Sequence, residues 1–342
     1  MAAHDGMPRS ANVEPVARIT VLFATLNGEH TLPRMIDTLE QLESPAEGWK
    51  VVAIDNGSID NSLRILESRA ARIPMTVLRE PRRGKNIALS AGLALSEGDI
   101  VALTDDDVIL PRNWLVAIEK VAAEQNAYDI FGGAIYPVWE RSPPDWILRC
   151  VEKGFFAWTD FPEGPIEFWG VWGPSMAVRT SVLRKHRFAE SIGPNGSAAY
   201  AMGSDGEFTM RAERNGHRCW HFHAAPVGHI IRPYQLTPEW LLQRAHNLGR
   251  GHGRMAGLRS HQASTQVWGY PLRRVLGLVR SAGYLTTAAC RVATSRLSGS
   301  FEEQFKALSR LRYCQGTLAE RYASVRHASA HNRHDTEITS QK

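Results

Sequence analysis

The feature that most constrains the fold of this chain is the alternation of short apolar runs with helical repeats in its first third. Four runs, at residues 18–24, 51–54, 75–78 and 99–103, have the length and composition of buried strands. Between them apolar residues recur every three or four positions, most clearly over 32–42, as in a helix that buries one face. Strands that alternate with helices form a mostly parallel sheet with helices on both faces, so the sequence predicts an α/β fold.

Polar residues stand where three of these predicted strands end. Thr25 and Asn27 follow the first strand, Asp55 ends the second, and Asp105–Asp107 follow the fourth. Sheets of this class bind ligands beyond the carboxyl ends of their strands. The fold therefore predicts that these residues, which are far apart in the sequence, share one crevice.

The acidic triplet Asp105–Asp107 is the strongest candidate for a metal site. Neighbouring carboxylates repel one another, and a divalent cation relieves that repulsion. Carboxylate oxygens suit Mg²⁺ or Mn²⁺, and Mg²⁺ is usually held by one or two carboxylates together with substrate phosphates. We interpret the triplet as the site of a metal that bridges the protein and a diphosphate. The alternative is an acidic surface turn before Pro111.

Two further groups suit a nucleotide ligand. Asp55 could accept hydrogen bonds from a ribose hydroxyl or a base N–H, although an Asp before Asn-Gly also forms turns. The basic segment 82–86 lies at the start of a predicted helix, where Lys85 and free N–H groups could hold a phosphate. The alternative for this segment is a solvated basic loop.

Asp205 and Glu207 lie where a Gly- and Ser-rich loop at 193–206, a candidate mobile lid, meets a predicted helix. A carboxylate at this junction can act as a general base that takes the proton from an attacking hydroxyl. The alternative is that both acids complement the positive end of the helix dipole.

Four histidines cluster near Cys219, namely His217, His221, His223 and His229. A zinc site is conceivable, but the spacing matches no standard zinc finger, which favours structural roles for most of them. His229 is the best candidate for a third metal ligand. The four cysteines of the chain are far apart and indicate reduced thiols.

Charge is distributed unevenly along the chain. Residues 1–240 carry 24 basic and 30 acidic side chains, and residues 241–342 carry 16 basic and 5 acidic ones, which is a net charge of −6 followed by +11. The basic part favours an anionic partner such as a membrane surface, nucleic acid or a phosphorylated substrate, and the alternative is a solvated basic face. Residues 271–297 mix apolar residues with arginines, as in a helix that lies on an anionic membrane. The alternative is a helix packed on the rest of the protein.

Several motifs occur in a fixed order along residues 17–255 and resemble the family 2 glycosyltransferases of GT-A fold. They are Thr25-Leu-Asn27, Ile54-Asp-Asn-Gly-Ser58, Arg83-Gly-Lys-Asn-Ile-Ala-Leu89, Leu103-Thr-Asp-Asp-Asp-Val108, Gly173-Pro-Ser-Met-Ala-Val-Arg179 and Gly203-Ser-Asp-Gly-Glu207, followed by His229. The order of the motifs, rather than any single one, carries the resemblance.

The resemblance implies a role for each matching residue. The donor-binding residues are Thr25, Asn27, Asp55, Lys85, Asp105 and Asp106; the metal ligands are Asp107, Asp105 and His229; the acceptor region holds Trp172, Ser204 and Glu207. Asp105 and Asp107 match the two acids of the DxD motif, and Asp205 matches the catalytic base. The implied reaction is metal-assisted, inverting transfer of a sugar from a nucleotide-diphosphate sugar to an acceptor hydroxyl in polysaccharide or glycoconjugate biosynthesis, with Mn²⁺ or Mg²⁺ as cofactor.

The resemblance also suggests partners and boundaries. The expected acceptor is a carbohydrate or a lipid-linked sugar, and no nucleic acid is expected. Residues 1–15 lack the apolar core of a secretory signal, which predicts a cytoplasmic protein, peripheral on the inner face of the membrane if the basic helices bind lipid. The predicted regions are a disordered N-terminus at 1–16, a catalytic domain at 17–255 with a donor half at 17–127 and an acceptor half at 128–255, a basic helical extension at 256–328 and a disordered tail at 329–342.

The chain departs from the family pattern at three serines. Ser204 stands where another acid is usual before the base, and Ser175 and Ser90 stand where Asn is common. The Gln-x-x-Arg-Trp signature of processive synthases is absent, so the sequence predicts transfer of a single sugar.

Three rival functions have sequence requirements that can be compared with this chain. A dinucleotide-dependent dehydrogenase needs a GxGxxG turn after the first strand, and the chain has one Gly there, Gly28. A nucleotidyltransferase also uses strand-end acids and Mg²⁺ but would release pyrophosphate. A non-catalytic nucleotide- or sugar-binding protein derived from a transferase is the third alternative.

Overall fold

The computed structural model describes residues 19–259, 266–267, 270–298 and 300–339. The strands are β1 (Ile19–Thr25), β2 (Trp49–Asp55), β3 (Met75–Arg79), β4 (Ile100–Leu103), β5 (Val108–Ile109), β6 (Ile130–Trp139), β7 (Gly164–Ile166), β8 (Met176–Arg179), β9 (Cys219–Ile231), β10 (Gln266–Val267) and β11 (Tyr270–Pro271). Within the described residues, β1 to β9 form one nine-stranded sheet. Eight of the strands follow the order β3-β2-β1-β4-β8-β6-β9-β5, and the remaining strand, β7, pairs with β9. The predicted disordered N-terminus at 1–16 lies outside the described residues.

The sheet is parallel in its first half and mixed in its second. β3, β2, β1 and β4 pair in parallel, as predicted. β8 then runs antiparallel to both β4 and β6, while β6 and β9 pair in parallel. The predicted mostly parallel order therefore holds for β1 to β4, and the second half of the sheet is mixed because β8 runs antiparallel to both of its neighbours.

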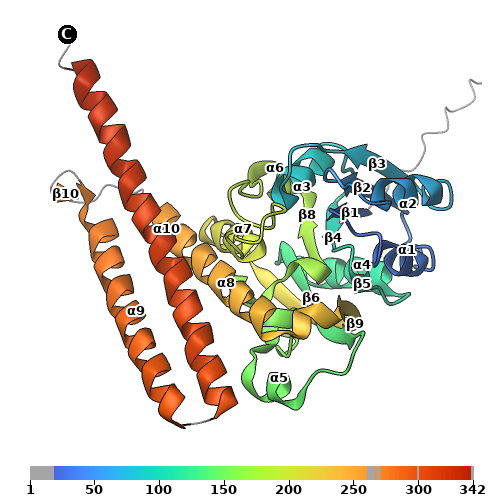
Figure 1. Cartoon of the computed structure of the whole chain (residues 1–342). Coiled ribbons are helices and arrows are strands. Elements are labelled where there is room, and N and C mark those ends of the chain that lie inside the picture. The colour runs from blue at the N-terminus through green and yellow to red at the C-terminus, as the bar shows by residue number, and fades with distance from the viewer. Residues whose placement is uncertain (1–18, 260–265, 268–269, 299, 340–342) are drawn as a thin grey trace, which may run out of the picture.

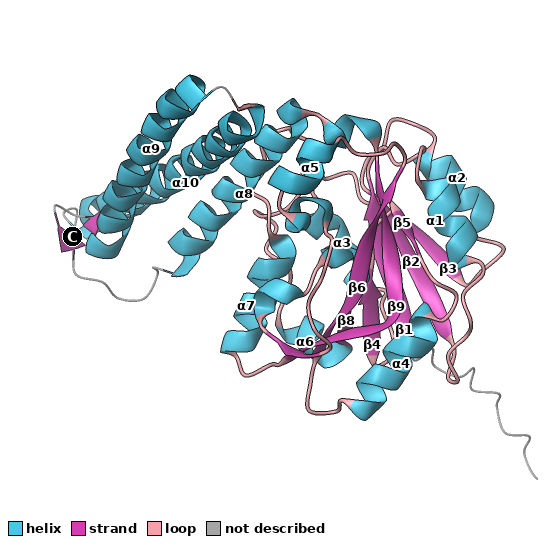
Figure 2. Cartoon of the chain, turned by 90° about the horizontal axis from the view of Figure 1, so that it is seen from below, coloured by secondary structure: helices cyan, strands magenta, loops and turns pink. Residues whose placement is uncertain are grey.

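Helices cover both faces of this sheet (Figure 2). The helices of this part are α1 (Leu32–Leu39), α2 (Ser62–Arg69), α3 (Lys85–Leu93), α4 (Trp114–Glu124), α5 (Asp145–Cys150), α6 (Thr180–Lys185) and α7 (Ser204–Arg214). Alternate residues of β1 enter different cores, because successive side chains of a strand point to opposite faces. Val21 packs with α1 and α4, whereas Leu22 packs with α3 and α7. The α/β architecture predicted from the sequence is confirmed.

Three long helices complete the chain: α8 (Pro238–Arg259), α9 (Leu272–Ser298) and α10 (Phe301–Thr339). α9 and α10 form a hairpin on the side of α8 that faces away from the sheet, and α10 packs along α8 (Figure 1). Every helix in the described part of the chain is too short or too polar to span a lipid bilayer.

The C-terminal tail differs from the prediction. Disorder was predicted for 329–342, but α10 continues to Thr339. The sequence explains the difference, since no Gly or Pro follows Gly316 to end the helix. The predicted disorder of 340–342 concerns residues outside the described ones.

Candidate active site

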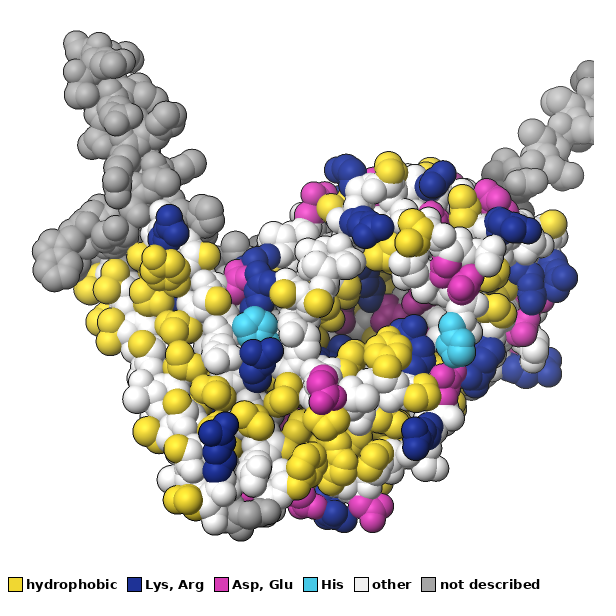
Figure 3. Space-filling model, viewed as in Figure 1, with side chains coloured by type: hydrophobic (Ala, Val, Ile, Leu, Met, Phe, Trp, Pro, Cys, Tyr) yellow, Lys and Arg dark blue, Asp and Glu magenta, His cyan; other side chains and the backbone are white. Residues whose placement is uncertain are grey.

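A cleft of about 780 Å³ lies beyond the carboxyl ends of β1 and β4. It is bounded by the start of α7, the end of β9 and one face of α8, and acidic side chains lie deep in the hollow in Figure 3. Among the predicted site residues, the cleft brings together Thr25, Lys85, Asp105, Asp106, Asp107, Trp172, Ser204, Asp205 and His229. The predicted convergence is thus seen for the ends of β1 and β4, whereas Asn27 and Asp55, which were expected in the same crevice, do not line it.

Two carboxylates of the acidic triplet have partners within the chain. Lys85, the first residue of α3, pairs with Asp105, and the Thr25 hydroxyl donates a hydrogen bond to Asp106. Burial alone would lower the pKa of Lys85, but the charges of Asp105, Asp205 and Asp107 outweigh it and the pKa lies above its ordinary value. Burial and the charge of Asp107 raise the pKa of Asp106 to about 7.

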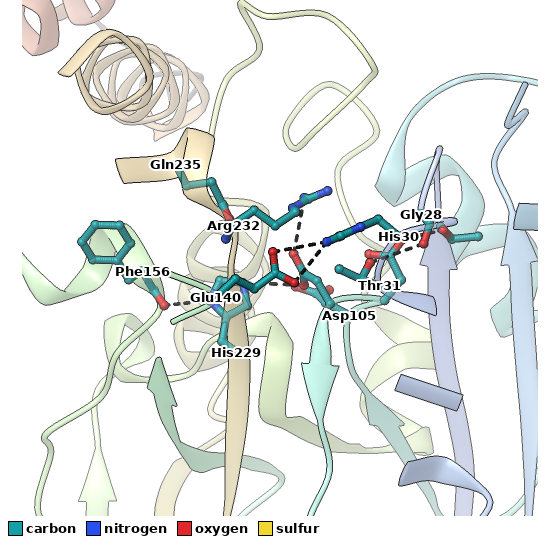
Figure 4. A network of polar contacts seen from close by, with 12 residues as sticks. Gly28, His30, Thr31, Asp105, Glu140, Phe156, His229, Arg232 and Gln235 are labelled. Carbon is teal, nitrogen blue, oxygen red and sulfur yellow. Dashed lines mark hydrogen bonds and ion pairs between the residues drawn. The ribbon is translucent and has the colours of Figure 1, made fainter. Parts of the chain in front are cut away.

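Asp107 faces His229 and Arg232 at the end of β9. The His229 Nε2 atom lies 3.6 Å from Asp107 Oδ1, and the Arg232 guanidinium lies 3.9 Å from Asp107 Oδ2. Burial raises the pKa of Asp107, but His229 and Arg232 overcome this effect and the pKa is below its ordinary value. His229 Nδ1 lies 2.7 Å from the Phe156 carbonyl, a contact in which the ring N–H donates (Figure 4).

This arrangement suits a metal ligand pair. A ring N–H that donates to a carbonyl fixes the tautomer whose other nitrogen has a free lone pair, which is the usual support for a metal-bound histidine. In His229 that nitrogen faces the Asp107 carboxylate at a separation too long for a hydrogen bond. Among the described residues, no group of three or more His, Cys, Asp or Glu side chains is arranged to hold a metal. The chain thus offers Asp107 and His229, and further ligands would come from a bound diphosphate.

Asp205 lies across the cleft in the first turn of α7. Its Oδ2 atom accepts a hydrogen bond of 2.9 Å from the Gly173 N–H, and its Oδ1 accepts one of 3.2 Å from the Ser204 hydroxyl. α7 begins after Gly203, whose φ of 104° lies in the left-handed region that favours glycine. The carboxylate is therefore fixed in orientation at the wall of the cleft.

Three predicted residues do not line the cleft. Asn27 ties the loop after β1 to the loop after β2, since its side chain accepts a 2.9 Å hydrogen bond from the Ile59 N–H. Asp55 is fully buried, and its Oδ2 atom has no hydrogen-bond partner in the described part of the chain. The Arg79 guanidinium lies 3.9 Å from this oxygen, so Asp55 is a buried carboxylate beside a cation at the end of β2.

Glu207, the third of these residues, points away from the cleft. It is buried and forms a bidentate ion pair with Arg211, with bonds of 2.9 and 3.0 Å. Residues two positions apart on a helix do not share a face, so Asp205 and Glu207 point in different directions. The predicted acceptor role of Glu207 therefore lacks geometric support, whereas Trp172 lines the cleft beside Trp169.

Sequence reasoning missed the wall that α8 contributes. Trp240, Arg244, Leu248 and His252 line the cleft, and they recur every four residues along one face of α8. The spacing can be seen in the sequence, but it does not show whether that face of the helix lines a cleft or packs against a hydrophobic core. Arg232, which follows β9, was also missed.

The other histidines of the cluster do not form a zinc site. His217 pairs with Asp129 at 2.9 Å, and His223 contacts the Phe161 carbonyl at 2.8 Å. His221 is fully buried, and neither ring nitrogen has a hydrogen-bond partner among the described residues.

The arrangement of strands, helices and cleft defines a GT-A-like transferase fold. The backbone is similar to that of the mannosyltransferase PcManGT from Pyrobaculum calidifontis, solved in complex with GDP-Man and Mn²⁺, with a TM-score of 0.57 and 18% sequence identity over 91% of this chain and 90% of that one. It is also similar to residues 1–349 of S. aureus TarS in complex with UDP-GlcNAc, with a TM-score of 0.51 and 16% identity over 87% and 90% of the two chains. At these identities the likeness concerns the fold.

The sequence comparison gives the family. The model of glycosyl transferase family 2 matches residues 20–187 of the chain. An undecaprenyl-phosphate 4-deoxy-4-formamido-L-arabinose transferase from Serratia proteamaculans is 28% identical over 126 residues, which are 36% of this chain and 38% of the relative. A transferase of the same name from Pectobacterium carotovorum is 28% identical over 125 residues. The chain thus matches less than two-fifths of the length of these curated relatives, and the resemblance seen in the sequence is confirmed at the level of family and fold.

Proposed function

We propose that this chain is a glycosyltransferase that moves one sugar from a nucleoside diphosphate sugar to an acceptor hydroxyl, with inversion at the anomeric carbon. The observation that carries the proposal is the position of Asp205 in the same cleft as Lys85 and the acidic triplet. A base and a diphosphate-binding group are the two parts that such a displacement requires.

The proposed reaction uses side chains that the cleft holds in fixed orientation. Asp205 accepts the proton of the acceptor hydroxyl, and the hydroxyl oxygen forms a bond to the anomeric carbon. The bond from that carbon to the diphosphate oxygen breaks, and the electron pair leaves with the nucleoside diphosphate. Because attack and departure occur on opposite faces of the sugar, the configuration inverts.

The donor side of the cleft supports the nucleotide and its phosphates. Asp55 lies at the end of β2 and is proposed to accept from a base or ribose, and Lys85 has positive charge for a phosphate. Asp107 and His229 would hold Mn²⁺ or Mg²⁺, whose positive charge stabilises the leaving diphosphate. Arg232 adds a second cation beside Asp107.

The acceptor is proposed to be a carbohydrate attached to a lipid carrier. The bacterial relatives are named as undecaprenyl-phosphate transferases, which supports a lipid on the acceptor side. The proposed setting is glycoconjugate or polysaccharide biosynthesis by an enzyme that is peripheral on the inner face of the membrane. Trp172 and Trp169 offer aromatic faces on which a sugar can stack.

The first experiment measures donor binding by thermal shift with UDP-, GDP- and dTDP-sugars, each with Mn²⁺, Mg²⁺ or EDTA. A ligand that binds only the folded chain raises the melting temperature, so one nucleotide should give a shift that EDTA abolishes. Asp107→Asn should lose the EDTA-sensitive part of this shift, because it removes a charged metal ligand. The absence of a shift with every donor would contradict the proposed donor site.

The second experiment measures turnover of Asp205→Asn. Loss of the base should lower kcat by about 10²- to 10⁴-fold while the donor-induced thermal shift stays unchanged. The products separate the rival functions, since a glycosyltransferase releases a nucleoside diphosphate and a nucleotidyltransferase releases pyrophosphate. Unchanged turnover in Asp205→Asn would rule out its role as base.

A further inference from the structure

A second pocket, of about 560 Å³, lies between α8, α9 and α10, outside the proposed active site. Four arginines from the two hairpin helices line it: Arg273 and Arg280 from α9, and Arg310 and Arg321 from α10. No Asp or Glu lines the pocket in the described part of the chain. The pocket therefore concentrates positive charge that the fold does not neutralise.

The arginines of this basic pocket lack carboxylate partners. In the described residues none of the four forms an ion pair, in contrast to Arg250 and Arg254 of α8, which both bind Glu320. The Nε atom of Arg321 is buried and has no hydrogen-bond partner in the same residues. A buried guanidinium N–H without an acceptor is costly, so the site is suited to an anion that accepts from it.

Polar and apolar groups around the basic pocket suit a phosphate that carries a lipid chain. Ser281 and Thr317 add polar side chains to its wall, although their hydroxyls donate to backbone carbonyls of Gly277 and of Gly249 and Tyr313, so the arginines are the donors for a phosphate. At its border Leu276 is 58% exposed, and Val279, on the same helix, is 64% exposed. Figure 3 shows hydrophobic side chains over the hairpin, with Lys and Arg side chains among them.

The basic pocket adjoins the active-site cleft. His252 of α8 lines both cavities, and its Nδ1 atom lies 2.7 Å from the Tyr313 hydroxyl of α10. A molecule with its phosphate in the basic pocket would therefore lie next to the cleft in which the sugar is transferred.

We propose that the basic pocket between α9 and α10 binds the phosphate headgroup of an anionic lipid, which positions a lipid-linked acceptor beside the cleft. The positioning of an acceptor by the pocket rests on the proposed function. The binding of a lipid phosphate in the pocket is independent of that function. The α9 helix supports a membrane-facing surface, since it carries five arginines and no acid.

The test compares two double variants of equal charge by co-sedimentation with vesicles. Arg273→Gln/Arg310→Gln removes two exposed arginines from opposite walls of the pocket, and Arg291→Gln/Arg296→Gln removes two exposed arginines of α9 that do not line it. The probe is phosphatidylcholine vesicles with and without phosphatidic acid. The pocket variant should bind phosphatidic acid vesicles about 30-fold more weakly than the native chain, and the matched variant should lose much less.

Several outcomes would overturn the proposal. Equal losses in the two variants would mean that general charge attraction, and not the pocket, binds the membrane. Vesicle binding that does not depend on phosphatidic acid would exclude a phosphate headgroup as the ligand. Binding of inorganic pyrophosphate by calorimetry, lost in the pocket variant while vesicle binding persists, would assign the pocket to a free phosphate instead.

The proposed function is tested separately in the same assay. Asp205→Asn should bind phosphatidic acid vesicles as the native chain does, because Asp205 is not part of the basic pocket. The pocket variant should keep the thermal shift with donor and lose transfer to a lipid-linked acceptor. Vesicle binding without any donor shift would leave the basic pocket supported and the proposed transferase activity refuted.

Discussion

At the scale of single residues, the chain gives three adjacent carboxylates three different environments. Asp105 has the Lys85 ammonium, Asp106 has the Thr25 hydroxyl, and Asp107 faces His229 and Arg232. Asp105 and Asp106 are in hydrogen-bond contact with their partners, whereas the partners of Asp107 lie 3.6 and 3.9 Å away. These contacts favour Asp107 as the proposed metal ligand among three residues that are identical in sequence.

His221 provides a prediction about pH at the same scale. Burial, followed by the charge of His223, lowers the pKa of His221 from 6.5 to about 4. A lowered folded pKa means that the unfolded chain binds the proton first as the pH falls below 6.5, so the stability from the neutral ring is lost between pH 6.5 and 4. The free energy of unfolding should fall by roughly 3 kcal/mol over this window through His221.

Urea unfolding at pH values from 7 to 4 measures this contribution. His221→Leu should lack most of the decline, whereas His223→Leu, a change at an exposed neighbour, should retain the larger part of it, which burial of His221 causes. An equal decline in native protein and His221→Leu would assign the acid sensitivity to other groups.

At the scale of elements, amphipathic segments were predictable and long-range placements were not. The strands and helices of residues 19–103 agree with the sequence prediction because the central strands are continuous apolar runs and the helices repeat apolar residues at helical spacing, and both patterns are local. The site residues at the ends of β1 and β4 were predictable for the same reason, since the topology places parallel strand ends together. Glu207 was expected in the acceptor region because it is close to Asp205 in sequence, but residues two positions apart lie on different faces of a helix. The wall from α8 was missed because its orientation depends on packing against α10.

The packing of α8 on α10 leads to a prediction about glycines. A Cβ atom on Gly249 of α8 would lie 2.0 Å from the Tyr313 carbonyl oxygen of α10, and this neighbour is backbone that cannot rotate away. Gly249→Ala should force the two helices apart and lower the free energy of unfolding by about 1–3 kcal/mol. Gly283→Ala in α9, where a Cβ meets nothing within 4 Å, should raise it by up to about 1 kcal/mol through helix propensity.

Thermal and urea unfolding of the two glycine variants provide the comparison. Opposite signs for Gly249→Ala and Gly283→Ala are expected. A neutral or stabilising effect of Gly249→Ala would mean that the α8–α10 contact is looser than these distances indicate.

At the scale of the whole molecule, one carboxylate connects the C-terminal hairpin to the active-site loop. Glu320 of α10 is buried and accepts hydrogen bonds from Arg250 and Arg254 of α8. The same two guanidiniums donate to the carbonyls of Ala199, within the loop predicted to be a mobile lid, and of Ser191, two residues before that loop. Removal of one charge on α10 should therefore loosen a wall of the cleft.

Steady-state kinetics of Glu320→Gln test this connection. The loop also contacts the donor side, since the Lys85 N–H donates to the Pro194 carbonyl at 2.8 Å, so the variant should raise the KM for the donor by on the order of tenfold. Glu303→Gln is the matched control, because Glu303 is exposed on α10 and its carboxylate has no ion pair in the described residues. Identical donor KM values in the two variants would show that α10 holds α8 in place without any influence on the cleft.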